Sequence, residues 1–180
     1  MIRLRTRPKI EAHLKERPYL SVEGRLVPVY FLDATEGSEA QWDFNAKADT
    51  LAFYLNGSPE RELLLKNLLR EVAGHAIIPR ARQLATKSQL KFSDVNIRDQ
   101  RSRWGSCSGR KALSFNWRLV LLPPHLHDYV IYHELAHLKH FNHSDKFWSF
   151  LNELDPNSEA HDKELTTVAR SIIPLGMGLK

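Results

Sequence analysis

Four histidines and one glutamate lie within eleven positions, in the stretch "HELAHLKHFNHSDKFW" at residues 133–148. On a helix, His133 and His137 are four positions apart, so both imidazoles lie on one face, about 6 Å apart along the axis. Neutral imidazole nitrogens are good ligands for Zn²⁺. Glu134 stands beside them, where a carboxylate can take a proton from water during hydrolysis. The H-E-x-x-H spacing therefore predicts a hydrolytic metal site with Glu134 as general base.

A third ligand is needed, and the sequence leaves three alternatives. His140 would lie roughly 10 Å from His133 along a continuous helix, which is too far for both to bind one ion. His143 can return to the histidine pair if the helix ends near His140 and the chain then turns back. A carboxylate from the following segments, Glu153 or Glu159, is the remaining alternative. We expect His143 to be the third ligand.

A second group of chemically useful residues is the arginine-rich stretch "RDQRSRWGSCSGRK" at residues 98–111. If it forms a strand, Arg101 and Arg103 share one face and Trp104 points to the other. Such a strand could pair with an extended peptide, or its arginines could bind phosphates beside the metal. A purely structural alternative has Trp104 in the core and the arginines paired with acids. We predict that Arg101, Arg103 and Trp104 bind substrate.

Three further side chains near these motifs have expected structural roles. Cys107 is the single cysteine, so no internal disulfide can form, which favours a reducing, cytoplasmic location. We expect it to pack as a small buried hydrophobe, with zinc ligation in a latent state as the weaker alternative. Tyr129 and Tyr132 flank the motif and are expected in the core, with stabilisation of a developing oxyanion as the alternative.

The elements that must position these residues read as strands first and helices last, which predicts an α+β fold. Residues 19–32 and 50–57 have strand patterns, while residues 33–49 read as turns. A helix is expected from Ser58 as N-cap and Pro59 as first helical residue, and Pro79 should kink or end it. Further segments follow in order: a resumed helix at 80–90, strands within 91–122, and helices at 125–140, 144–154 and 155–172.

The 180 residues suit one domain with a small extension. We expect a β-rich N-terminal part at residues 1–57 and a metal-dependent hydrolase domain at residues 58–180. The basic start of the chain has no apolar region typical of a secretory signal. No apolar run approaches the roughly 20 residues that span a bilayer, so we expect no membrane partner.

The net charge of +5 is unevenly distributed. Residues 61–118 hold 13 Lys and Arg against 4 Asp and Glu, whereas the rest of the chain holds 13 against 17. A basic middle suits nucleic acid or a nucleotide as well as a solvated surface. Two alternatives to a peptide substrate follow: a nucleoside triphosphate pyrophosphatase that uses Mg²⁺ or Mn²⁺ at the same site, and a DNA-associated protease. Three histidines are softer ligands than Mg²⁺ or Mn²⁺ prefer, which favours zinc.

Four segments in this order resemble the YgjP-like metallopeptidase family, which is related to SprT-like and minimal gluzincin-type zincins. They are "RSRWGSCS", "LSFNWRLVLLP", "YVIYHELAHL" and "NHSDKFW". The resemblance covers roughly residues 60–155, and the first 50 residues resemble the family only loosely.

The resemblance implies a zincin-like fold, in which a twisted sheet is combined with an active-site helix and C-terminal helices. It implies His133, Glu134 and His137 on that helix, His143 as third ligand, and residues 103–107 as a motif strand. It also implies an intracellular metal-dependent hydrolase. A nucleotide pyrophosphatase activity has been associated with the family's namesake, so both peptides and nucleotides are candidate substrates.

Overall fold

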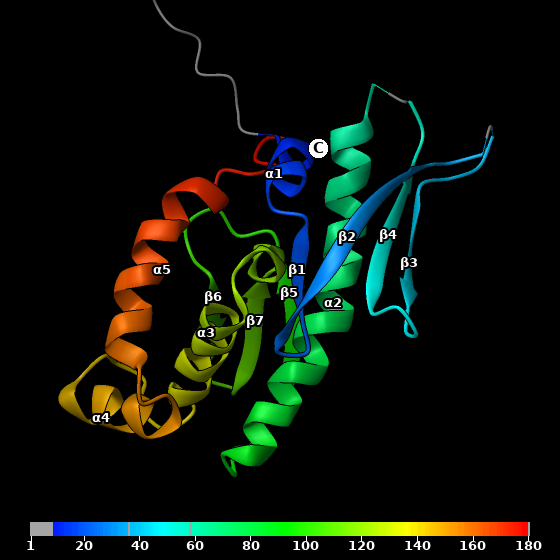
Figure 1. The fold of residues 1–180 in the computed structure, drawn as a ribbon. Helices are drawn as coiled ribbons and strands as arrows, with labels where there is room; N and C mark the ends of the chain where they lie inside the picture. Colours follow the sequence, from blue (N-terminus) through cyan, green and yellow to red (C-terminus); the bar gives the residue numbers. More distant parts are fainter. Residues whose placement is uncertain (1–8, 36, 58, 180) are drawn as a thin grey trace, which may run out of the picture.

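The computed structural model describes residues 9–35, 37–57 and 59–179 of the chain. They form an N-terminal four-stranded sheet, one long helix, a three-stranded sheet and a group of C-terminal helices (Figure 1). The predicted α+β class is confirmed. The elements are α1 (Ile10–Glu16), β1 (Tyr19–Val22), β2 (Arg25–Asp33), β3 (Gln41–Asn45), β4 (Thr50–Leu55), α2 (Arg61–Lys87), β5 (Asp94–Arg98), β6 (Gly105–Cys107), β7 (Ala112–Asn116), the 3₁₀ helix η1 (Trp117–Leu121), α3 (Pro124–Ala136), α4 (Asp145–Leu154) and α5 (Ser158–Ile172).

The N-terminal sheet has the strand order β1-β2-β4-β3. β1 and β2 form a hairpin that turns at Glu23 and Gly24, where both residues have positive φ. β2 then runs parallel to β4, and β3 is antiparallel to β4. The expectation of turns alone at residues 33–49 is wrong, because β3 lies there. Trp42 and Phe44 on β3 are only half-buried, and the residues between and beside them are exposed. The alternation of buried and exposed side chains that marks a strand is therefore weak here.

The long helix α2 crosses the molecule between the two sheets (Figure 1). Of the two effects expected of Pro79, a kink or an end of the helix, the end does not occur, because α2 continues to Lys87. Pro79 is exposed, so the one backbone bond that proline removes is lost on the side that faces water. Buried residues on both sides of Pro79, among them Ile77 and Ala81, keep the two halves packed. The helix starts at Arg61, later than Pro59, and Ser58 lies outside the described residues.

The second sheet has the order β5-β7-β6, so β6 is an edge strand. β5 is parallel and β6 antiparallel to β7. The strand expected to reach residue 122 stops at Asn116, and η1 follows. All five η1 side chains are buried, and the Asn116 side chain caps the start of η1 by accepting a hydrogen bond from the Arg118 backbone N–H. Pro124 then starts α3, as the Pro-Pro pair predicts.

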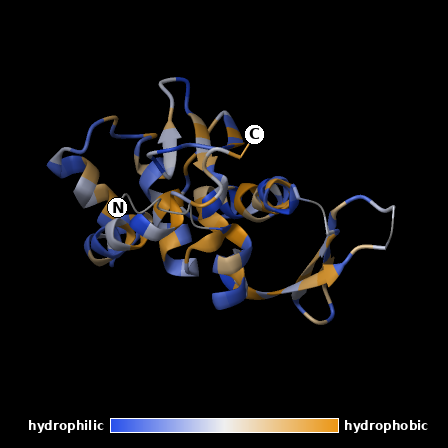
Figure 2. Ribbon diagram, turned by 90° about the horizontal axis from the view of Figure 1, so that it is seen from above, coloured by the Kyte–Doolittle hydropathy of each residue, from blue (hydrophilic) through white to orange (hydrophobic). Residues whose placement is uncertain are grey.

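The core gathers where the second sheet, η1 and the helices meet, as the apolar segments in the middle of Figure 2 show. The short helix α1 was not expected; Ile10 and Leu14 are its fully buried side chains. The N-terminal part also contacts the rest directly, because the Ser21 hydroxyl donates to the Leu122 carbonyl oxygen. The division into residues 1–57 and 58–180 stays a prediction.

Within the described residues, no helix combines the length and the apolar character that a membrane crossing requires.

Candidate metal centre and its cleft

The helix α3 positions the first two histidines. His133 lies in its last turn, and His137 is the first residue after Ala136, still with helical φ and ψ of −64° and −15°. The chain then turns, and α4 begins after Ser144 as expected. The turn brings His143 back over the end of α3. The predicted break is confirmed, although α3 ends a few residues before His140.

The three histidines converge on one point. His133, His137 and His143 each offer a ring nitrogen, and these atoms all lie within 4.8 Å of one another. The Nε2 atoms of His133 and His143 are 3.0 Å apart. His137 Nδ1 lies 2.9 Å from the backbone carbonyl oxygen of His140, to which it can donate. That bond leaves His137 Nε2 as the free lone pair, which is the usual arrangement of a metal-binding histidine.

The other candidates for the third ligand lie outside this group. The ring of His140 packs against Phe150, with 5.7 Å between centroids. Glu159 is exposed and accepts a hydrogen bond from Lys163. Glu153 is likewise not part of the converging group among the described residues.

The surroundings favour the neutral form of His133 and His137. Burial, together with repulsion of the charged form by the neighbouring His137 and His143, lowers the pKa of His133 to about 3. Burial also lowers the pKa of His137. Neutral imidazole is the form that binds a metal. Three such donors match zinc better than Mg²⁺ or Mn²⁺, so the residues present fit the zinc site that the sequence predicts.

Two aromatic side chains of α4, Phe147 and Trp148, pack against the imidazole rings of the three histidines. The Phe147 ring is fully buried, and its centroid is 5.0 Å from His133, 4.6 Å from His137 and 4.7 Å from His143. Trp148 flanks His133 and His143. Sequence patterns alone do not mark this pair as part of the site. The available signal is their spacing, since both follow His143 by about one helical turn.

Glu134 is 6% exposed and points toward the edge strand β6. Burial raises its pKa to about 8, while the Arg103 charge opposes that rise. A Cβ placed on Gly105 would lie only 2.7 Å from Glu134 Oε1. The carboxyl group therefore lies directly against the β6 backbone. Its other oxygen, Oε2, is buried with no hydrogen-bond partner among the described residues, which leaves it free for water or substrate.

A cleft of about 200 Å³ opens beside His133 and Glu134. Arg103 and Trp104 both line it, whereas Arg101 is exposed and does not. The expected alternation of faces from Arg101 to Trp104 is wrong, because only Gly105–Cys107 form a strand and the residues before it bend. The other lining residues come from β6, α3 and α5: Gly105, Tyr129, Val130, Asp162 and Leu165.

The segment that carries Arg103 is fixed by one buried side chain. Asn116 Nδ2 donates to the carbonyl oxygens of Gln100 and Arg103, at 2.8 and 3.0 Å. Asn116 Oδ1 accepts from the backbone N–H of Arg118 and from its guanidinium. Asn116 thus joins the cleft loop to η1.

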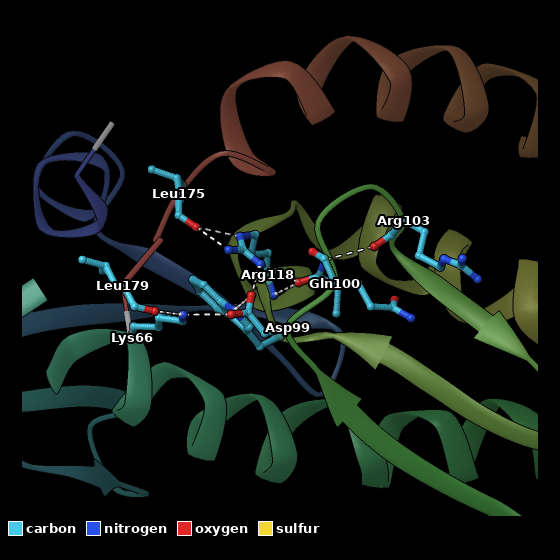
Figure 3. Close-up of polar contacts among 9 residues, drawn as sticks. Lys66, Asp99, Gln100, Arg103, Arg118, Leu175 and Leu179 are labelled. Carbon is cyan, nitrogen blue, oxygen red and sulfur yellow. Dashed lines mark hydrogen bonds and ion pairs between the residues drawn. The ribbon is translucent and has the colours of Figure 1, made fainter. Parts of the chain in front are cut away.

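An ion-pair network continues from there to the C-terminal residues (Figure 3). Asp99 accepts from Arg118 and pairs with Lys66, each at 2.8 Å. Arg118 is fully buried and also donates to the Leu175 carbonyl oxygen, while Lys66 donates to that of Leu179. The residues after α5 therefore help to hold the loop that forms one wall of the cleft.

The structure places the three side chains for which the sequence leaves two possible roles: Tyr129, Tyr132 and Cys107. Tyr129 is almost fully buried, and its hydroxyl donates to Asp162 Oδ1 at 2.8 Å. Tyr132 is 8% exposed and belongs to the core. Cys107 is half-buried on β6, less buried than expected, and it packs beside the core. Burial and the nearby Glu134 raise the pKa of its thiol.

Comparison with known proteins gives the family. A family model described as YgjP-like, metallopeptidase domain, matches residues 3–167. No curated protein matches this chain. Among solved structures, the crystal structure of the metallopeptidase zymogen of Pyrococcus abyssi abylysin aligns with a TM-score of 0.44 and 21% identity, over 51% of this chain and 94% of that one. The family model spans most of the chain, so the protein belongs to the YgjP-like family and is a metal-dependent hydrolase of the metallopeptidase class.

Proposed function

We propose that this protein is a zinc-dependent peptidase, in which His133, His137 and His143 hold the ion and Glu134 is the general base. One observation carries the proposal. Three imidazoles converge within 4.8 Å beside a buried carboxyl group that has one oxygen without a hydrogen-bond partner among the described residues. This combination supplies both a ligand set for zinc and a proton acceptor next to it.

When bound there, zinc activates water and polarises the scissile carbonyl group. Glu134 accepts the proton of the attacking water and later gives it to the leaving amine. Burial raises the pKa of Glu134 to about 8 and so favours the protonated form that gives its proton to the leaving amine, whereas a cation bound at the histidines would favour the ionised form that accepts the proton. The Arg103 charge opposes this rise and helps Glu134 to start the cycle ionised.

The edge strand β6 is the proposed binding site for the peptide backbone. β6 pairs with β7 on one side only, so the other edge offers unpaired backbone groups to an extended chain. Gly105 on this strand lies against Glu134. A peptide paired with β6 would thus pass beside the general base, with Arg103 and Trp104 at the entrance to the adjacent cleft.

Elemental analysis of the purified protein and matched variants tests this proposal. We expect about one zinc per chain in the wild type and in Glu134→Gln, and loss of zinc in His143→Ala. Peptide hydrolysis should disappear in both variants. His140→Ala is the matched control, because its ring lies outside the ligand group, and it should keep both metal and activity. An active Glu134→Gln enzyme, or zinc retained in His143→Ala, would contradict the proposal.

The alternatives, a nucleotide pyrophosphatase and a DNA-associated protease, rest on the basic residues of the middle segment. Several of these cations are engaged internally. Arg61 pairs with Glu11, Arg80 with Asp128, and Lys66 and Arg118 with Asp99. This engagement weakens the case for a nucleic-acid surface. Both alternatives stay predictions, as does the cytoplasmic location, and a nucleotide screen that releases no pyrophosphate would dispose of the first.

A further inference from the structure

The cleft holds one acidic side chain that the proposed mechanism does not use. Among the lining residues, Glu134 and Asp162 carry carboxyl groups and Arg103 carries a guanidinium. Arg103 acts on Glu134, since its charge lowers the pKa of that carboxyl group. Asp162 comes from another element, α5, and forms no ion pair within the described residues. It is therefore the lining carboxyl group that is left to meet a charge on a ligand.

Asp162 is held in place but not neutralised. Its Oδ1 accepts the Tyr129 hydroxyl at 2.8 Å, and the side chain is half-buried. It forms no ion pair with any described Lys, Arg or His. The two cationic side chains next to it on α5 pair with other acids, His161 with Asp155 and Lys163 with Glu159. A carboxylate fixed by one hydrogen bond keeps several acceptor positions open, and a cation is the ligand that suits them best.

The shape of the cleft suits one long side chain. Its volume is about 200 Å³, and apolar surface from Trp104, Val130 and Leu165 lines it along with the polar groups. Lysine and arginine carry an apolar stem with a charge at the end, so the stem can lie on apolar surface while the charge reaches a carboxylate. Tyr129, which binds Asp162, lies one turn of α3 before His133, and the two ring centroids are 6.0 Å apart. Asp162 therefore lies near the proposed metal site without being part of it.

We propose that this cleft is a specificity subsite for a lysine or arginine side chain of the substrate peptide, with Asp162 as the residue that recognises its charge and Tyr129 as the residue that positions Asp162. This inference rests on the proposed peptidase function and names the substrate class of the same site. The competing explanation is that the Tyr129–Asp162 bond only ties α3 to α5. That role would affect stability, and it would not affect the choice among substrates.

The test uses the full-length, zinc-loaded protein and a set of internally quenched peptides. One scaffold carries lysine, arginine, citrulline, norleucine or glutamate at each position in turn. In the wild type we expect one position at which lysine or arginine exceeds norleucine and citrulline in kcat/KM by about tenfold or more, the effect of one charged hydrogen bond. Citrulline separates charge from length, because it matches arginine in shape.

Asp162→Asn should bring that ratio close to one, whereas Asp162→Glu should keep the preference for a cation. Glu164→Gln is the matched control. It removes a charge from the same helix, but Glu164 pairs with His125 away from the cleft, so the wild-type ratio should persist. If melting shows that Asp162→Asn does not fold, Asp162→Ser replaces it.

The outcomes separate the two proposals. Peptide cleavage without a cationic preference, or a preference that survives removal of the Asp162 charge, overturns the subsite and leaves the peptidase function intact. A zinc-loaded wild type that cleaves none of the peptides overturns the peptidase function, and the subsite with it.

Discussion

Replacing Gly105 by alanine adds one methyl group at the tightest point of the site. The new Cβ would lie 2.7 Å from Glu134 Oε1 and Cγ and 2.9 Å from its Cδ. Ordinary carbon contacts lie near 3.5–4.0 Å, so about 1 Å of overlap must be relieved. The β6 backbone is held by β7, and Glu134 sits on a buried face of α3. The group that can yield is the Glu134 carboxyl group itself.

Because the Glu134 side chain moves and the backbone does not, the loss of stability and the loss of activity should differ in size. A side chain that rotates away costs less than a shifted backbone, so the loss of folding stability should stay at about 1–2 kcal/mol, the low end for an overpacked site. Catalysis is more sensitive, because a displacement of about 1 Å in a reacting group costs roughly 100-fold. The metal ligands are not touched. We therefore expect Gly105→Ala to lose about 100-fold in kcat/KM while it keeps its zinc.

The assay combines kcat/KM on a quenched peptide, zinc content and thermal melting. Gly109→Ala is the matched control, because a Cβ there meets nothing within 4 Å. It should behave like the wild type in all three measurements. Wild-type activity in Gly105→Ala would refute the inferred contact between β6 and the general base. Loss of zinc in parallel with activity would show that the disturbance reaches the histidines and would refute the argument that only Glu134 moves.

Three further perturbations have defined outcomes. Asp99→Asn should lower the free energy of unfolding by roughly 2–4 kcal/mol at pH 7, because it leaves the buried Arg118 and Lys66 without their carboxylate. Burial alone would raise the pKa of Asp99, but its hydrogen bonds with Lys66, Arg118 and Trp117 lower it from 3.8 to about 2. That ionised group contributes stability above pH 3.8 and loses it as the pH falls toward 2, so urea unfolding of the two proteins should converge over this range. Asn116→Ala removes both bonds to the loop before β6; kcat/KM should fall more than zinc content, and equal losses would contradict a positioning role. Phe147→Ala opens a cavity under the three histidines; competition with a chelator should show weaker zinc binding, and melting should show a loss of roughly 3–5 kcal/mol.

The part of the site that the sequence could predict is the part that depends on local geometry. His133, Glu134 and His137 are related by helical spacing alone, and α3 follows from the Pro-Pro start and the apolar run after it. The turn that returns His143 is also local, since it needs only a helix end and a new start at Ser144. The α+β class follows from the order of the strand and helix patterns along the chain.

The wall of the cleft could not be predicted in this way. The segment around Arg103 has strand-like residues, but its bend is imposed by Asn116, which lies in the next strand and binds two of its carbonyl oxygens. The opposite wall includes Asp162, 25 residues after His137, and a helix pattern does not show which of its faces meets α3. The helix through Pro79 is a similar case, because packing on both sides outweighs the local preference against proline.

The same long-range dependence links the C-terminal residues to the chemistry. Arg118 is fully buried, and its guanidinium donates to Asp99, to the Asn116 side chain and to the Leu175 carbonyl oxygen. Asp99 and Gln100 begin the loop that leads to Arg103, so the position of Arg103 beside Glu134 depends on residues that follow the last helix. A buried cation must be paired, and here the pairing partners are the groups that shape the cleft. The specificity of the enzyme is therefore expected to change with substitutions around Leu175, although these residues do not line the cleft.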